Sequence, residues 1–124
     1  MTREDKMFRT ILKSKIHGAK VTESNLEYKG SITIDSAILE AIDIIPNEKV
    51  QVVNLNNGSR LETYVIPGEK DSGKIGMNGG AARLSAVGDR LLIMSYALME
   101  TKDTVGYAPK IVFLDDKNKI VDKK

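Results

Sequence analysis

The chain has 124 residues, which is enough for one domain with a sizeable core but not for two. Apolar residues make up 41% and charged residues 29%, which excludes a disordered chain, and a net charge of +2 is too balanced to indicate nucleic acid or an acidic membrane surface. The absence of cysteine excludes disulfides and thiolate metal sites and fits a reducing compartment. Without an apolar secretory signal or a run near the roughly 20 residues of a membrane span, we expect a cytoplasmic protein.

The first predicted element is a strand over residues 7–22, a stretch rich in β-forming residues. Its polar residues Lys13, Lys15 and His17 recur at every second position and should therefore share one face. His17 is the only histidine, and without cysteine a metal site here would need surrounding carboxylates. We therefore interpret it as a strand histidine that bonds to a neighbour, and we predict no metal site.

The next elements are a second strand, a short helix and a hairpin. The strand is predicted over residues 31–34, after which Asp35 can cap a helix over residues 36–42. Beyond Pro46, residues 48–66 predict two alternating strands on either side of Asn57-Gly58. Positive φ angles at these two residues would close a tight turn.

The last third of the chain predicts further short elements. Glycine-rich turns bracket a short strand around Ile75, residues 81–85 predict one helical turn, and residues 90–99 form a nearly continuous apolar strand. Residues 110–115 predict the last strand. The lysine-rich segment after this strand predicts a solvated tail. No repeat or linker interrupts this order, which indicates one compact, mainly β barrel.

The stretch GMNGGAA at residues 76–82 contains three glycines, but it matches neither the phosphate-binding loop nor the dinucleotide-binding fingerprint. A tight turn is the simplest interpretation, and an anion approached by backbone N–H groups is the functional one. Lys15, Lys20 and Arg60 would by pattern alone be solvated strand charges. With no Trp, two Phe and four Tyr, a base-stacking nucleic-acid surface is not indicated.

Three stretches, at residues 13–35, 57–66 and 73–89, together resemble the aspartate 1-decarboxylase family of pyruvoyl enzymes, which make β-alanine for pantothenate biosynthesis. The resemblance runs without gaps from about Met7 to Asp89 and more loosely to Asp116. It implies a double-psi β-barrel with short helices, formed by residues 1–124 as a single domain. It also implies a homotetramer.

The resemblance distinguishes the two Gly-Ser dipeptides of the chain. In this family the bond that is here Gly30–Ser31 is cut by the protein itself, so that the chain is a zymogen of fragments 1–30 and 31–124. The Ser31 hydroxyl attacks the Gly30 carbonyl, an ester replaces the amide, and β-elimination and hydrolysis leave a covalent pyruvoyl group at position 31. Gly58-Ser59 lies in the hairpin turn and receives no such role. Whether an accessory maturation protein assists the cleavage stays open.

The resemblance also implies a decarboxylation site for L-aspartate. The ketone at position 31 would form a Schiff base with the substrate and act as an electron sink. Tyr64 matches the family's proton donor, since a phenol keeps its proton at neutral pH. Arg60 and Lys15 match its carboxylate-binding residues, and Thr63 a substrate contact that also assists cleavage. The other matching substrate-binding positions are His17, Asn78, Gly79, Gly80 and Ala81.

Two alternatives stay open beside this hypothesis. One is a non-enzymatic small β-barrel that binds or regulates a partner, which would not cleave itself. The other is a pyruvoyl or hydrolytic enzyme that acts on a different amino acid. The chain departs from the family pattern in a charged extension over residues 1–6, in Gly80 where alanine is common, in Arg83, and in its lysine-rich tail.

Overall fold

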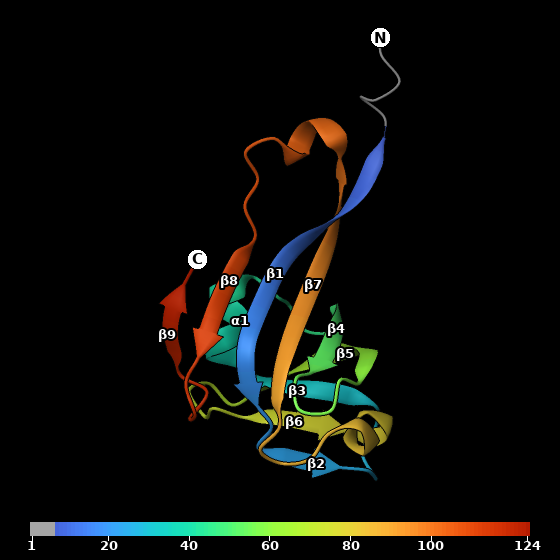
Figure 1. Ribbon diagram of the computed structural model, residues 1–124, viewed down its shortest axis with the longest axis vertical. Helices are drawn as coiled ribbons and strands as arrows, with labels where there is room; N and C mark the ends of the chain where they lie inside the picture. Colours follow the sequence, from blue (N-terminus) through green and yellow to red (C-terminus); the bar gives the residue numbers. More distant parts are fainter. Residues whose placement is uncertain (1–6) are drawn as a thin grey trace.

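The computed structural model describes residues 7–124 (Figure 1). The charged extension, residues 1–6, therefore lies outside the described residues. The elements in chain order are β1 (Phe8–Lys20), β2 (Glu23–Asn25), β3 (Ser31–Asp35), α1 (Ser36–Ile42), β4 (Lys49–Asn54), β5 (Arg60–Gly68), β6 (Ile75–Asn78), the 3-10 helix η2 (Gly79–Leu84), β7 (Arg90–Glu100), the 3-10 helix η3 (Thr101–Thr104), β8 (Lys110–Leu114) and β9 (Ile120–Lys123).

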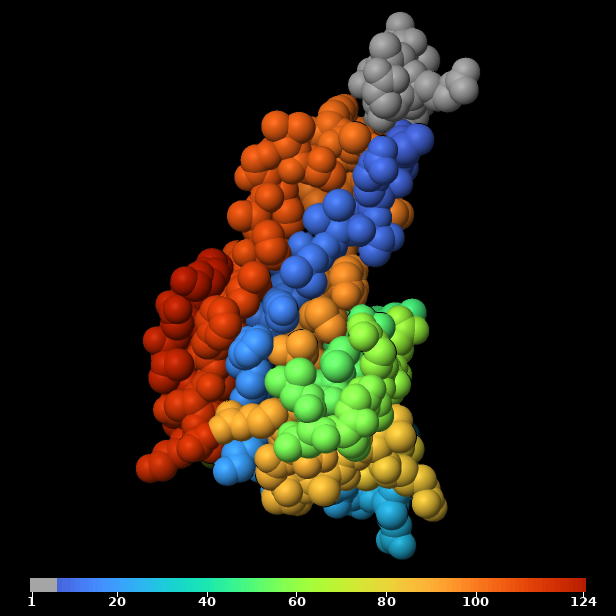
Figure 2. Space-filling model, in the orientation of Figure 1, coloured from blue at the N-terminus to red at the C-terminus, as the bar shows by residue number. Residues whose placement is uncertain are grey.

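The strands of the described chain pair in the order β2-β6-β3-β5-β4-β7-β1-β8-β9. β1 lies antiparallel to β7 and parallel to β8, so the N-terminal strand is held on both sides. β3 lies between β5, which is parallel to it, and β6, which is antiparallel. Figure 1 shows the long β1–β7 ribbon extending well beyond the body of the molecule, and Figure 2 shows the same projection in space-filling form.

The core lies beneath the central strands and α1. All five residues of β3 are buried, and strands flank it on both edges. β4 and β7 alternate buried and partly exposed residues, as expected for strands that cover a core on one face. The buried apolar side chains that form this core include Ile16, Ile32, Ile34, Ile38, Ile42, Val50, Val52, Val65, Ile75, Leu91 and Ile93.

The predicted capping of the short helix is confirmed. The Asp35 carboxylate accepts a hydrogen bond from the Ala37 N–H at 2.9 Å, at the start of α1. It also accepts N–H bonds from Asp71 and Gly73, both at 2.9 Å. The residue that starts the helix therefore also fixes the loop before β6.

The prediction that Lys13, Lys15 and His17 share one face is wrong for Lys13. A β-bulge shifts the β1–β7 register between Leu12 and Ser14 and breaks the two-residue alternation. Lys13 Nζ lies 3.1 Å from Glu48 Oε2 and also contacts the Asp43 carbonyl, on the side of α1. Lys15 and His17 alternate with the fully buried Ile16 and face the opposite way.

The predicted tight turn at Asn57-Gly58 also needs correction, in its φ angles and in its length. The β4–β5 turn uses a positive φ only at Gly58, at 76°, whereas Asn57 is not left-handed. The connection is longer than a two-residue turn, since β4 ends at Asn54 and β5 begins at Arg60. Within this connection the Gly58 N–H donates a hydrogen bond to the Asn54 carbonyl at 2.8 Å.

The predicted tail after residues 110–115 is solvated as expected, since residues 121–124 are exposed, but it is not free of secondary structure. β9 pairs antiparallel with β8, and Asn118 in the turn between them is 2% exposed. Asn118 Nδ2 donates to the Lys20 and Gly73 carbonyls, both at 2.8 Å. The lysine-rich segment therefore contains the strand that forms this edge of the sheet.

The other predicted strands and the helical turn near residues 81–85 are present, the turn as η2. The predicted fold class, a double-psi β-barrel with short helices, is thus confirmed in its mainly β character. Within residues 7–124, no helix is long and apolar enough to cross a membrane.

Candidate active site

The Gly30–Ser31 bond joins an exposed loop to a buried strand. Residues 26–30 are exposed, whereas Ser31 is 0% exposed and begins β3. The exposed loop ends at Gly30, since Ser31 and Ile32 are both buried in the sheet. The left-handed φ angles of the described non-glycine residues all lie outside this loop.

The Ser31 hydroxyl is held by a buried amide. Asn78 Nδ2 donates to Ser31 Oγ at 2.9 Å and to Thr33 Oγ1 at 3.0 Å. The Ser31 hydroxyl itself donates to the Lys29 carbonyl at 3.1 Å. Asn78, predicted as a substrate-binding residue, therefore contacts the nucleophile oxygen directly. Its place opposite Ser31 follows from the antiparallel pairing of β3 with β6.

The turn that follows β6 lies against the loop that precedes Ser31. Gly79 has a φ of 61°, and a Cβ atom there would lie 2.6 Å from the Gly30 nitrogen and 2.7 Å from the Tyr28 carbonyl oxygen. Only glycine fits so close to another backbone in this conformation. Gly80 is different, since a Cβ atom there would meet nothing within 4 Å.

A pocket of about 450 Å³ opens beside Gly30, and we call it the Gly30 pocket. Its size falls in the range of small-molecule sites. It brings together five of the predicted site residues from three separate parts of the chain. The residues that line it are Gly30, Leu61, Glu62, Thr63, Tyr64, Gly80, Ala81 and Leu84.

Three of the predicted substrate-binding side chains do not line this pocket, namely Lys15, His17 and Arg60. Arg60 at the start of β5 bonds to Gln51 Oε1 at 3.4 Å, and the His17 ring packs 5.1 Å from the Phe113 ring. Through the register, His17, Leu92, Val53 and Arg60 form one row across four strands. At about 4.8 Å per strand the ends of this row are roughly 14 Å apart. Lys15 lies two residues before His17 on the same face of β1.

Sequence reasoning missed a second pocket, which lies beside the buried Asn78 amide. Its volume is about 420 Å³, and both Asn78 and Thr33 line it. Lys74 Nζ and Glu23 Oε1 form an ion pair at 2.8 Å beside these residues. Thr33 had a signal in the sequence, because it lies two residues after Ser31 and therefore on the same face of a strand.

Two carboxyl groups near the strand ends have pKa values below their ordinary range. Hydrogen bonds from the Asn54 side chain and the Ala86 N–H lower the pKa of Asp89, although burial opposes them. Burial raises the pKa of Glu48, but bonds from Ser95, the Ile45 N–H and Lys13 outweigh it and the net shift is downward. Among the described residues, no group of three or more His, Asp or Glu could hold a metal ion.

Ser31 is buried, has its hydroxyl oxygen bonded to an amide and follows Gly30, which lines a pocket of small-molecule size. This arrangement favours the class of β-sheet proteins with a small-molecule site. The comparisons give the family. The aspartate decarboxylase family model matches residues 7–121. The chain is 61% identical over 115 residues to the aspartate 1-decarboxylase of Carboxydothermus hydrogenoformans, covering 93% of this chain and 91% of the relative. It is 62% identical over 114 residues to that of Listeria monocytogenes, covering 92% and 90%.

The chain therefore belongs to the aspartate decarboxylase family, which confirms the resemblance inferred from its motifs. Among solved structures, the computationally designed msDPBB_sym2 protein aligns with a TM-score of 0.42 and 14% identity. The alignment covers 72% of this chain and all of that protein.

Proposed function

We propose that the protein is a pyruvoyl-dependent carboxy-lyase that converts L-aspartate to β-alanine and CO2 for pantothenate biosynthesis, after cutting its own Gly30–Ser31 bond. The observation that carries this proposal is the Ser31 hydroxyl, which is fully buried, is bonded to Asn78 at 2.9 Å and belongs to the residue directly after Gly30, which lines the Gly30 pocket. Family membership and relatives that are named as aspartate 1-decarboxylases support the reaction. A cytoplasmic location stays a prediction.

The self-cleavage uses only groups of this chain and water. Ser31 Oγ attacks the Gly30 carbonyl carbon and the C–N bond breaks, so that an ester replaces the amide. Elimination then releases the Gly30 carboxylate, and water replaces the nitrogen of residue 31, which leaves as ammonia. Asn78 holds Oγ in place, and Thr63 lines the same pocket as Gly30, where it can contact the carbonyl under attack.

Cleavage would not release the N-terminal fragment. β1 lies between β7 and β8 and pairs with both, and β2 pairs with β6. The backbone hydrogen bonds of these strand pairs hold fragment 1–30 to fragment 31–124 even after the Gly30–Ser31 bond is cut. We therefore expect the two fragments to stay together in one folded unit.

The residues around position 31 fit a pyruvoyl group. Asn78 Nδ2, which bonds to Ser31 Oγ in the intact chain, would donate to an oxygen of the group. Such a group supplies an electrophilic carbonyl that draws electrons from the α-carbon of the substrate. Tyr64 lines the Gly30 pocket and would deliver the proton to that carbon. The turn of Gly79, Gly80 and Ala81 would bind the substrate through its backbone N–H groups.

The cations that should bind the substrate carboxylates would come from a second copy of the chain. Lys15 and Arg60 do not line the Gly30 pocket, and both belong to the face of the sheet opposite the core. A neighbouring copy that placed this face over the Gly30 pocket would complete the site. This arrangement supports the proposed homotetramer, with each active site near a subunit boundary.

The test is to follow cleavage and decarboxylation in the wild type and in Ser31→Ala. Intact mass spectrometry should show two fragments for the wild type and one full-length species for Ser31→Ala, since alanine offers neither nucleophile nor leaving group. β-Alanine should form only with the wild type. An uncleaved, inactive wild type would favour the non-enzymatic binding module instead.

Two further measurements complete the test. Turnover of glutamate or other amino acids in preference to aspartate would favour the other enzyme class. Light scattering should give a multiple of the 13.7 kDa chain mass, and a monomer at micromolar concentration would contradict the shared site.

A further inference from the structure

We propose that Asn54 is a positioning residue for substrate binding. It fixes the η2 turn, which brings Gly80 and Ala81 to the Gly30 pocket, against the β4–β5 hairpin, which brings Thr63 and Tyr64. The proposal rests on the proposed function, because it assumes that the Gly30 pocket binds the substrate. Asn54 itself does not line that pocket and acts through the turn.

Every hydrogen-bonding group of the Asn54 side chain has a partner. The residue is 2% exposed at the end of β4. Its Nδ2 donates to the Leu84 carbonyl at 3.1 Å and to Asp89 Oδ2 at 2.8 Å. Its Oδ1 accepts the N–H groups of Asn56 at 2.8 Å and Asn57 at 3.3 Å. One side chain therefore shapes the hairpin turn and ties it to the chain after η2.

The Leu84 carbonyl is the point at which the hairpin holds the turn. Besides Asn54, it accepts hydrogen bonds from Asn57 Nδ2 at 3.1 Å and Ser59 Oγ at 3.0 Å. Leu84 is the last residue of η2 and lines the Gly30 pocket. In Figure 2 the hairpin, in green, lies next to the yellow and orange segment that follows β6.

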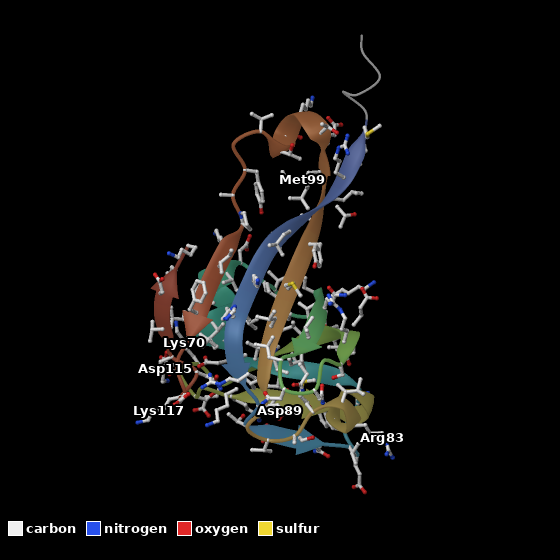
Figure 3. The ribbon with its side chains drawn as sticks, viewed as in Figure 1. Lys70, Arg83, Asp89, Met99, Asp115 and Lys117 are labelled. Carbon is white, nitrogen blue, oxygen red and sulfur yellow. The ribbon has the colours of Figure 1, made fainter. Side chains whose placement is uncertain are left out.

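Asp89 anchors the same arrangement from the other side. Its Oδ2 accepts the Ala86 N–H at 2.9 Å as well as the Asn54 amide, so it closes the loop between η2 and β7. Figure 3 places Asp89 at the foot of β7, while Arg83 of η2 points outward. At its other end η2 is held by the close approach of Gly79 to Gly30. The η2 turn is thus fixed at both ends, and Asn54 is the buried side chain that fixes its C-terminal end.

Loss of the Asn54 amide should affect substrate binding more than cleavage. The Ser31 hydroxyl is held by Asn78 on β6, which does not depend on the hairpin contacts. The η2 turn, in contrast, would lose the bonds that set its distance from β5. We therefore expect a rise in the KM for aspartate, with cleavage still complete.

The experiment compares Asn54→Asp with a matched control, Asn118→Asp. Asn54→Asp keeps the shape and the acceptor oxygen but removes the two donated bonds and places a carboxylate against that of Asp89. Asn118 is equally buried, at 2%, and also donates two bonds to hold a turn, but it lies outside the Gly30 pocket. Fragment formation, Tm, kcat and KM for aspartate are measured for both variants and for the wild type.

We expect Asn54→Asp to raise KM about tenfold, which corresponds to about 1.4 kcal/mol, with a smaller change in kcat. Asn118→Asp should lower Tm and leave KM within about twofold of the wild type, since its contacts fix no part of the pocket. The double variant Asn57→Ala/Ser59→Ala, which removes the other two bonds to the Leu84 carbonyl, should raise KM in the same direction.

An equal rise in KM for Asn118→Asp would overturn the proposal, because the effect would then be general destabilisation. An unchanged KM in the double variant would overturn it as well, and that variant decides the question if Asn54→Asp does not fold. A failure of the proposed function would be seen separately, as a wild type that does not decarboxylate aspartate.

Discussion

Replacing Gly79 with alanine should disturb the loop that carries the scissile bond. The new Cβ would lie 2.6 Å from the Gly30 nitrogen, 2.7 Å from the Tyr28 oxygen and 2.8 Å from the Gly30 Cα. All three are backbone atoms, so no flexible side chain can yield. A left-handed φ costs a non-glycine residue about 1–2 kcal/mol, and overpacking typically adds about 1–3 kcal/mol.

We therefore expect Gly79→Ala to lose about 2–5 kcal/mol of stability as the sum of these two costs. A displacement of reacting groups by about 1 Å can slow a reaction about 100-fold, so cleavage at Gly30–Ser31 should slow by about 10–100-fold. The assay is a time course of fragment formation by intact mass spectrometry on freshly purified precursor, together with the Tm of the uncleaved protein.

Gly80→Ala is the matched control, since a Cβ atom at Gly80 meets nothing within 4 Å and its φ is not positive. Its cleavage rate and Tm should stay close to those of the wild type. If Gly79→Ala cleaved as fast as Gly80→Ala and melted at the same temperature, the close approach of the turn to the scissile loop would not constrain the precursor, and the reasoning would be wrong.

Three further predictions concern single side chains. Tyr64→Phe should cleave normally yet lose about 10²–10⁴-fold in kcat, because the ring is kept but the proton donor is not; normal turnover in the fully cleaved variant would remove Tyr64 from the mechanism. Arg60→Ala should cleave and fold normally but lose kcat/KM for aspartate, since a hydrogen bond to a charged group contributes about 1.5–3 kcal/mol; an unchanged kcat/KM would refute this role. Asp89 has a pKa below its ordinary 3.8, so its charged form stabilises the fold above that pH and the gain disappears as pH falls through the lowered pKa. Asp89→Asn should therefore lower Tm at pH 7 by more than at acid pH, and a difference in Tm that did not shrink on acidification would contradict this.

Much of the fold follows from local sequence signals. Asp35 before a helical run predicts α1 and its cap, because a carboxylate at that position satisfies a free N–H of the first turn. The apolar run of residues 90–99 predicts β7, and the glycine-rich turns on either side of Ile75 predict β6. The motifs around Gly30-Ser31, Thr63-Tyr64 and Asn78 to Ala81 also sufficed to identify the family, which the comparisons confirm.

Long-range pairing decided what local patterns could not. The bulge that turns Lys13 toward Glu48 and the pairing of β9 with β8 both depend on partners elsewhere in the chain. The alternation rule assumes an unbroken strand, and the lysine-rich composition of residues 117–124 favours a solvated segment until β8 is there to pair with it.

The same distinction applies to the candidate site. The sequence by itself determined which residues match the family and that Ser31 follows a glycine. Only the tertiary structure showed that Asn78 holds the Ser31 hydroxyl, since strands β3 and β6 must pair to bring them within 2.9 Å. It also separated Lys15 from the Gly30 pocket, because the position of β1 in the sheet is set by its pairing with β7 and β8 and not by any local preference.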